Sequence, residues 1–205
     1  MNGGVNNSVI SAVVLAAGSS SRMGAIKPLV PVGGKSMLDC VLAILRESHM
    51  DDILVVLGYE AEVIQQNVLF GDAKVVVNPS YRDGMASSLQ TGLAHLTPEA
   101  EAALIVLADQ PFLQPRTIDI LIDEYRRKRP KIVIPIFNGR RGNPVLLDRS
   151  VFGDVSELKG DVGFRAVFGN HEQAILTVPV DDPGVLVDLD TAADVQRFER
   201  SISPR

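Results

Sequence analysis

The chain of 205 residues is long enough to bury a substantial core, and its 46% hydrophobic and 22% charged residues are typical of a soluble globular protein. Its net charge of −5 argues against sequence-independent binding to nucleic acid. No apolar run has the length that crosses a membrane, and the first residues lack the basic and apolar regions of a secretory signal. The single cysteine, Cys40, can form no internal disulfide. We therefore expect a cytoplasmic protein that binds neither nucleic acid nor membranes.

Strands and helices are predicted to alternate after a flexible polar tail over residues 1–8. Residues 10–17 are almost wholly apolar and lack polar alternation, as in a strand that is buried on both faces. Further strands are predicted over residues 52–58, 73–78 and 103–108. Helices are predicted after Ser36, over residues 60–69, after Gly84 and around residues 118–125. This order predicts an α/β fold with an open, mostly parallel, Rossmann-like sheet that has helices on both faces.

The pattern changes after Lys131. Residues 132–137 and 144–147 flank a turn-rich segment, which is typical of a hairpin-like β excursion in the C-terminal half. A short helix from Asp161, a strand over residues 174–180 and a last helix over residues 191–200 complete the prediction. We expect residues 9–205 to form a single domain.

The first predicted strand ends at Gly18 in a run of small polar residues, which Arg22 and Lys27 follow. Small side chains let backbone N–H groups approach a ligand closely, and successive N–H groups in a turn bind anions. The spacing does not fit the P-loop, because alanine (Ala25) and not lysine directly follows Gly24. It does not fit the dinucleotide fingerprint either, because Ser20 stands in place of the second glycine. The segment therefore predicts a polyphosphate site of another class.

Carboxylates stand at two positions that suit a metal ion. Asp109 directly follows a predicted strand and precedes Pro111, so it is either a turn cap or a metal ligand. Asp188 and Asp190 precede the last predicted helix, where Asp190 or Thr191 can cap the helix and Asp190 can equally bind a metal.

These segments resemble the motifs of one enzyme family. Residues 15–27 are similar to the Leu-Ala-Ala-Gly-x-Ser-x-Arg-Met-Gly-x-x-Lys signature of molybdenum cofactor cytidylyltransferases, a branch of the MobA-like nucleotidyltransferases. Residues 108–111 and 188–194 resemble the family's Gly-Asp-x-Pro and Asp-Ile-Asp-Thr-Pro-x-Asp motifs. The resemblance implies a fold like that of the nucleotide-diphospho-sugar transferases. It also implies transfer of CMP from CTP to the phosphate of molybdopterin cofactor, with release of pyrophosphate and with Mg²⁺ as cofactor.

The resemblance also assigns roles to individual residues. Residues 9–130 would bind the nucleotide and residues 131–205 the acceptor. The metal ligands would be Asp109 and Asp190, and the catalytic residues Arg22, Lys27 and Asp109. The nucleotide-binding residues would be Leu15, Ala16, Ala17, Gly18, Ser19, Arg22, Lys27, Gly84 and Ser88. The acceptor-binding residues would be Gly142, Asn143, Pro144, Asp161 and Arg165, with Asn143 in place of the family's histidine.

The preference for CTP over GTP depends on Ala17, because the guanylyl-transferring relatives usually carry glycine there. One alternative is a transferase of the same fold that acts on another phosphorylated acceptor, such as a sugar or polyol phosphate. A second is a non-catalytic carrier that delivers the finished cofactor to a recipient molybdoenzyme. A third, a nicotinamide-dependent oxidoreductase, is disfavoured by the missing dinucleotide fingerprint.

Overall fold

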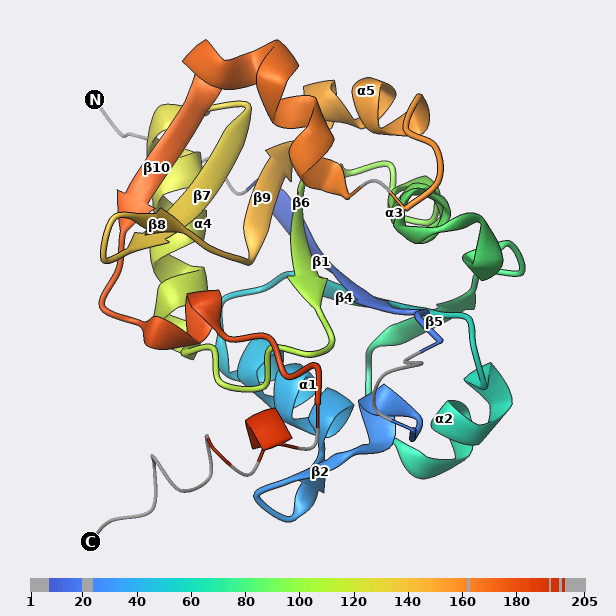
Figure 1. The fold of residues 1–205 in the computed structure, drawn as a ribbon. Helices are drawn as coiled ribbons and strands as arrows, with labels where there is room; N and C mark the ends of the chain where they lie inside the picture. The colour runs from blue at the N-terminus through green and yellow to red at the C-terminus, as the bar shows by residue number, and fades with distance from the viewer. Residues whose placement is uncertain (1–7, 20–23, 162, 192, 196, 198–205) are drawn as a thin grey trace, which may run out of the picture.

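A computed structural model describes residues 8–19, 24–161, 163–191, 193–195 and 197 (Figure 1). In this part of the chain one sheet of eight strands forms the centre of the molecule. Its order is β10 (Ile175–Pro179), β7 (Ile132–Phe137), β9 (Val145–Asp148), β6 (Ala100–Leu107), β1 (Val9–Ala16), β4 (Asp52–Leu57) and β5 (Lys74–Val77), and β8 (Arg140–Arg141) pairs with β7. The pairs β6–β1, β1–β4, β4–β5 and β10–β7 are parallel, which confirms the mostly parallel α/β sheet.

Strand β1 has apolar residues on both faces because each face meets a separate core. Ala12 and Val14 pack in a cluster that contains apolar side chains of α1 (Met37–Glu47) and α4 (Pro115–Lys128). Val13 packs on the other face, in a cluster that contains residues of α3 (Met85–Ala94) and α5 (Phe152–Ser156). Helix α2 (Ala61–Asn67) adds Ile64 to the first cluster. Helices therefore cover both faces of the sheet, as predicted.

Local signals define the start of helix α1. The Ser36 hydroxyl accepts a hydrogen bond from the backbone N–H of Asp39 at 3.0 Å, which satisfies one of the free donors of the first turn. A small antiparallel ribbon of β2 (Pro31–Val32) and β3 (Lys35–Ser36) precedes the helix and was not predicted.

The predicted β excursion is part of the central sheet. Strands β7 and β8 form the expected hairpin. Strand β9 then pairs antiparallel with both β6 and β7, so it is inserted between them and joins the two halves of the chain. The short helix that was predicted from Asp161 is a 3-10 helix, Phe164–Ala174, and the strand over residues 174–180 is β10. Most of the predicted last helix lies outside the described residues.

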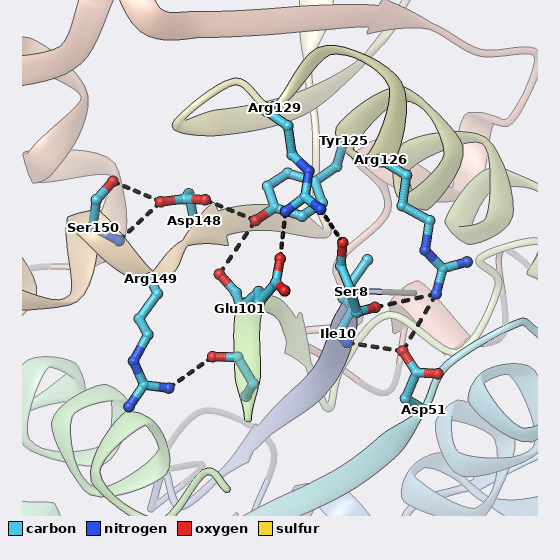
Figure 2. Close-up of polar contacts among 11 residues, drawn as sticks. Ser8, Ile10, Asp51, Glu101, Tyr125, Arg126, Arg129, Asp148, Arg149 and Ser150 are labelled. Carbon is cyan, nitrogen blue, oxygen red and sulfur yellow. Dashed lines mark hydrogen bonds and ion pairs between the residues drawn. The ribbon is translucent and has the colours of Figure 1, made fainter. Parts of the chain in front are cut away.

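Polar contacts fix the edge of the sheet at which β1 and β6 begin (Figure 2). The hydroxyl of Tyr125, a residue whose side chain is fully buried, donates to Asp148 Oδ2 at 2.7 Å and to the carbonyl of Glu101 at 3.2 Å. These bonds join α4, β9 and β6. The pKa of Tyr125 is raised because burial disfavours the phenolate and the Asp148 carboxylate repels it, so the phenol remains a donor at neutral pH.

The start of β1 is held at the same edge. Ser8 was placed in the polar tail by the sequence, but it is fully buried and its carbonyl accepts a hydrogen bond from Arg126 Nη2 at 3.3 Å. Its hydroxyl is bonded to Arg129. The Asp51 carboxylate accepts from the N–H of Ile10 at 2.8 Å (Figure 2). The remaining tail, residues 1–7, lies outside the described residues. No helix in the described segments is both long and apolar enough to cross a membrane.

Candidate active site

A cleft of about 850 Å³ lies at the carboxyl ends of β1, β4 and β6, at the opposite edge of the sheet from Ser8 and Tyr125. Ligands bind at this edge in open parallel α/β sheets. Most of the residues that were predicted to bind the nucleotide or metal line the cleft: Leu15, Ala16, Ala17, Gly18, Ser19, Lys27, Gly84, Ser88, Asp109 and Asp190. The exception is Arg22, which lies outside the described residues.

The loop after β1 continues the hydrogen bonding of the sheet into the cleft. The carbonyl of Leu15 accepts from the N–H of Ala108 at 3.2 Å, and the carbonyl of Ala17 accepts from the N–H of Tyr59 at 3.1 Å. These bonds hold the first residues of the loop between β4 and β6. Among the described residues, no heavy atom lies within 4 Å of a Cβ placed on Gly18, which lines the cleft.

Lys27 is the central charge of the cleft. Its Nζ lies 2.6 Å from Asp109 Oδ2 and 2.7 Å from Asp190 Oδ1, and only 17% of its side chain is exposed. Burial alone would lower the pKa of this ammonium, but the charges and hydrogen bonds of the two carboxylates outweigh burial and raise the pKa. Lys27 is therefore charged at neutral pH. It connects the glycine-rich loop, the segment between β1 and Lys27, with both predicted metal ligands.

Asp109 is brought to Asp190 by the backbone. The carbonyl of Asp109 accepts from the N–H of Leu189 at 3.0 Å, so the segment that carries Asp190 lies directly beside the end of β6. Next to this bond, the buried Gln110 donates from Nε2 to Asp188 Oδ1 at 2.6 Å. Burial and then the charge of Asp109 raise the pKa of Asp188. This role of Gln110 was not predicted, because in the sequence only its place between Asp109 and Pro111 marks it.

The choice between capping and metal binding for Asp190 follows from the next turn of the chain. Thr191 makes the reciprocal bonds of a helix cap with Asp194: its N–H donates to Asp194 Oδ2 at 2.9 Å, and its hydroxyl accepts from the N–H of Asp194 at 3.2 Å. Asp190 instead directs its carboxylate to Lys27. Its side chain is 53% exposed, so it remains accessible to a ligand in the cleft.

Two carboxylates in the cleft offer hard oxygen donors to a divalent cation. Asp109 Oδ1 is buried and has no hydrogen-bond partner among the described residues, whereas Oδ2 contacts Lys27. In the same part of the chain, no three His, Cys, Asp or Glu side chains are grouped to hold a metal. Mg²⁺ is commonly held by one or two carboxylates together with substrate phosphates and water, so Asp109 and Asp190 fit this type of site.

The loop before α3 closes another side of the cleft. Gly84 has φ 99° and ψ 179°, a conformation that is essentially restricted to glycine, and a Cβ there would lie 2.3 Å from the carbonyl of Gly160. Ser88 lies in the first part of α3 and is 5% exposed, and its hydroxyl accepts from Asn78 Nδ2 at 3.0 Å. Asn78, which the sequence did not identify, is 1% exposed and holds this loop to the end of β5.

Three further residues of the cleft were missed in the sequence. Tyr59 and Tyr81 meet edge to face with ring centroids 6.4 Å apart, and the guanidinium carbon of Arg82 lies 5.1 Å from the centroid of Tyr81. They follow β4 and β5, so their place after strand ends was the available signal. Their aromatic and cationic surfaces suit a planar or anionic ligand.

The predicted acceptor residues separate into two groups. Asp161 lines the cleft, whereas Gly142, Asn143, Pro144 and Arg165 are not part of its lining. Asn143 is 4% exposed, its N–H donates to the carbonyl of Val185 at 2.9 Å, and its side-chain oxygen accepts from Arg165 at 3.3 Å. A Cβ on Gly142 would lie 2.4 Å from the same carbonyl, so this glycine is required by packing.

The chain is similar along nearly its whole length to two enzymes with different names. It is 25% identical over 202 residues to nicotine blue oxidoreductase of Paenarthrobacter nicotinovorans, covering 92% of this chain and 96% of that protein. It is 24% identical over 190 residues to the molybdenum cofactor cytidylyltransferase of Escherichia coli, covering 91% and 94%.

Solved structures share the fold. The crystal structure of Rv0371c from Mycobacterium tuberculosis superposes with a TM-score of 0.83 at 31% identity, over 94% of this chain and 98% of that one. A structure of Rv0371c in complex with manganese gives a TM-score of 0.82 at 28% identity. The model of the MobA-like NTP transferase domain matches residues 12–185, which include the second half of β1, the loop after it and Asp109. The chain therefore belongs to the MobA-like NTP transferase family.

Proposed function

We propose that this nucleotidyltransferase joins CMP from CTP to the phosphate of molybdopterin cofactor and releases pyrophosphate. The observation that carries the proposal is the meeting of Lys27, Asp109 and Asp190 beside the glycine-rich loop, within one cleft. A cation and a pair of carboxylates beside a backbone loop are the groups that align and neutralise a triphosphate.

In the proposed reaction an oxygen of the acceptor phosphate attacks the α-phosphorus of CTP. A new P–O bond forms, and the bond between the α-phosphorus and the bridging oxygen of pyrophosphate breaks. The attacking phosphate is already anionic, so no side chain has to remove a proton. The protein's task is to hold the two substrates in line and to stabilise the charge that develops on the phosphate oxygens.

The described residues divide this task between them. Backbone N–H groups near Gly18 would bind phosphate oxygens, and Lys27 would follow the α-phosphate into the transition state as a mobile point charge. Arg22, in the same loop, would grip further phosphate oxygens. Asp109 and Asp190 would hold Mg²⁺, which supplies Lewis-acid stabilisation of the phosphates when it is bound. The manganese complex of the structural relative Rv0371c supports a divalent metal.

The acceptor and the base are proposed from the resemblance and from the cytidylyltransferase relative. Ala17 lies in the lining and is 5% exposed, so its Cβ would narrow the space for a purine. Asp161 is the acceptor residue that lies in the cleft, and the Asn143–Arg165 pair would act only if the acceptor extends beyond it. Ser88 and Gly84 would contact the base or ribose from the other side.

Release of pyrophosphate tests the proposal directly. We expect release from CTP with Mg²⁺ and molybdopterin cofactor, little with GTP, and none after chelation of the metal. Asp109→Asn should be inactive. Asp119→Asn is the matched control, because Asp119 has a similar exposed fraction, 24% against 22%, but lies on α4 outside the cleft lining.

Other outcomes would point to the alternatives. Release of pyrophosphate with a sugar or polyol phosphate, and none with molybdopterin cofactor, would favour a transferase with another acceptor. Binding of molybdopterin cofactor without any turnover, and without dependence on Asp109, would favour a carrier. Oxidation of NADH or NADPH in the presence of nicotine blue would favour the activity that the name of the relative from Paenarthrobacter nicotinovorans states.

A further inference from the structure

The ammonium of Lys27 occupies the place between the two proposed metal ligands. Its distances of 2.6 Å to Asp109 Oδ2 and 2.7 Å to Asp190 Oδ1 are those of charge-assisted hydrogen bonds. One cation, the Lys27 ammonium, therefore bridges the two carboxylates.

The oxygen that Lys27 holds on Asp109 is the one that a metal would need. Asp109 Oδ1 is buried from solvent, so Oδ2, which contacts Lys27, is the oxygen on the accessible side. An ion that enters from the cleft meets this oxygen and Asp190 Oδ1. It cannot approach both closely while the ammonium bonds to them, because two cations would then lie a few ångströms apart.

The charges make the replacement of Lys27 by a metal ion at these carboxylates, here called the exchange, depend on the nucleotide. The Lys27 ammonium offsets one of the negative charges of Asp109 and Asp190, so these two carboxylates attract a divalent cation less than they would without the lysine. A triphosphate offers Lys27 several anionic oxygens in place of Asp109 and Asp190. When the lysine turns to the phosphates, it gives up its bonds to Asp109 Oδ2 and Asp190 Oδ1, and a metal can take its place at these two oxygens.

We propose that Lys27 and the divalent cation compete for Asp109 and Asp190, so that the lysine keeps the metal site closed until a triphosphate draws it away. This inference rests on the proposed function, because it takes the two carboxylates as the metal ligands. By linkage, metal and nucleotide would then raise each other's affinity, because the nucleotide removes the competitor of the metal.

Binding of Mn²⁺ to the nucleotide-free protein tests the exchange. Mn²⁺ takes the oxygen ligands that Mg²⁺ takes, and its unbound form is measured by electron paramagnetic resonance. We expect Lys27→Met to bind Mn²⁺ about tenfold more tightly than the unmodified protein, since one competing charge is removed. Lys27→Gln, a second neutral variant, should show the same gain. Lys27→Arg keeps the charge and should bind as weakly as the unmodified protein.

Controls locate the effect. Lys74→Met removes a lysine that lies 3.2 Å from Asp52 outside the cleft lining, and it should leave Mn²⁺ affinity unchanged. The gain of Lys27→Met should disappear when Asp109→Asn is added. The exchange is refuted if neither neutral variant gains affinity, or if the gain persists without the Asp109 carboxylate.

The two proposals fail separately. Release of pyrophosphate by the unmodified protein, with no gain of Mn²⁺ affinity in Lys27→Met, overturns the exchange alone. A gain of Mn²⁺ affinity in a protein that turns over no nucleoside triphosphate overturns the transferase activity and leaves the exchange supported.

Discussion

Replacement of Gly18 by alanine tests whether this glycine is needed for binding of the triphosphate or for folding. Its φ lies outside the left-handed region, and a Cβ would have no heavy atom of the described residues within 4 Å. The structure therefore accommodates alanine without strain. Alanine also restricts the unfolded chain more than glycine does, so we expect Gly18→Ala to raise the free energy of unfolding by about 0.4–1 kcal/mol.

The same methyl group would stand where the phosphates are proposed to bind. Loss of one hydrogen bond between a backbone N–H and a charged phosphate costs about 1.5–3 kcal/mol. Since about 1.4 kcal/mol corresponds to a factor of ten, the affinity for CTP should fall by roughly ten- to a hundredfold. Calorimetric titration with CTP measures this loss, and urea unfolding of the same preparation measures the stability.

Gly84→Ala supplies the contrast. With φ 99° and a Cβ placed 2.3 Å from the carbonyl of Gly160, alanine strains the backbone and pushes two walls of the cleft apart. We expect it to lose both CTP affinity and about 1–3 kcal/mol of stability. If Gly18→Ala binds CTP as tightly as the unmodified protein, the triphosphate does not lie against this backbone and the proposed phosphate site is wrong.

Three further variants test the remaining parts of the argument. Asp109→Asn should abolish pyrophosphate release while the melting temperature stays within a few degrees, and wild-type turnover would remove its metal role. Ala17→Gly should shift the ratio of CTP to GTP turnover toward GTP, and an unchanged ratio would discard the steric explanation. Tyr125→Phe removes a hydrogen bond to Asp148 and should lower the free energy of unfolding by about 1–2 kcal/mol at neutral pH. Burial raises the pKa of Asp148, but hydrogen bonds from Ser150 and Tyr125 outweigh burial and lower that pKa. The stabilisation by the Tyr125–Asp148 bond is therefore present above the ordinary aspartate pKa and is lost as the pH falls through the lowered value. Urea unfolding at neutral pH and at about pH 3 should therefore show the Tyr125→Phe difference shrinking in acid; a constant difference would contradict this.

The parallel strands were predictable because each one contains a continuous run of apolar residues, which indicates burial on both faces. Residues 10–17 are apolar on both sides of the chain, and the structure places Val13 and Val14 in separate cores. The serine cap of α1 and the turn before β8 likewise depend on neighbouring residues. The insertion of β9 between β6 and β7 was not predictable in this way, since antiparallel pairing with both neighbours depends on segments far apart in the chain.

The site was predictable to a similar degree. The signature over residues 15–27 and the motif around Asp109 indicated the loop after β1, Lys27 and Asp109 as site residues. The structure brings them together in the cleft. None of the motifs in the sequence includes Tyr59, Tyr81 or Arg82. The ring contact between Tyr59 and Tyr81 depends on the placement of β4 beside β5 in the sheet. Local sequence also left the capping residue undecided between Asp190 and Thr191, because either type caps a helix.

The shared contact of Asp109 and Asp190 with Lys27 affects what Lys27 variants should do. One backbone hydrogen bond, from Leu189 to Asp109, holds the two carboxylates near each other, and the lysine offsets their repulsion. A neutral side chain at this position should therefore strengthen metal binding and at the same time remove the charge that follows the α-phosphate. If turnover fell only because the metal was lost, high Mg²⁺ would restore it. Since we expect the metal to bind more tightly, turnover of Lys27→Met should remain low at every Mg²⁺ concentration, and full rescue by Mg²⁺ would assign the lysine to metal retention instead.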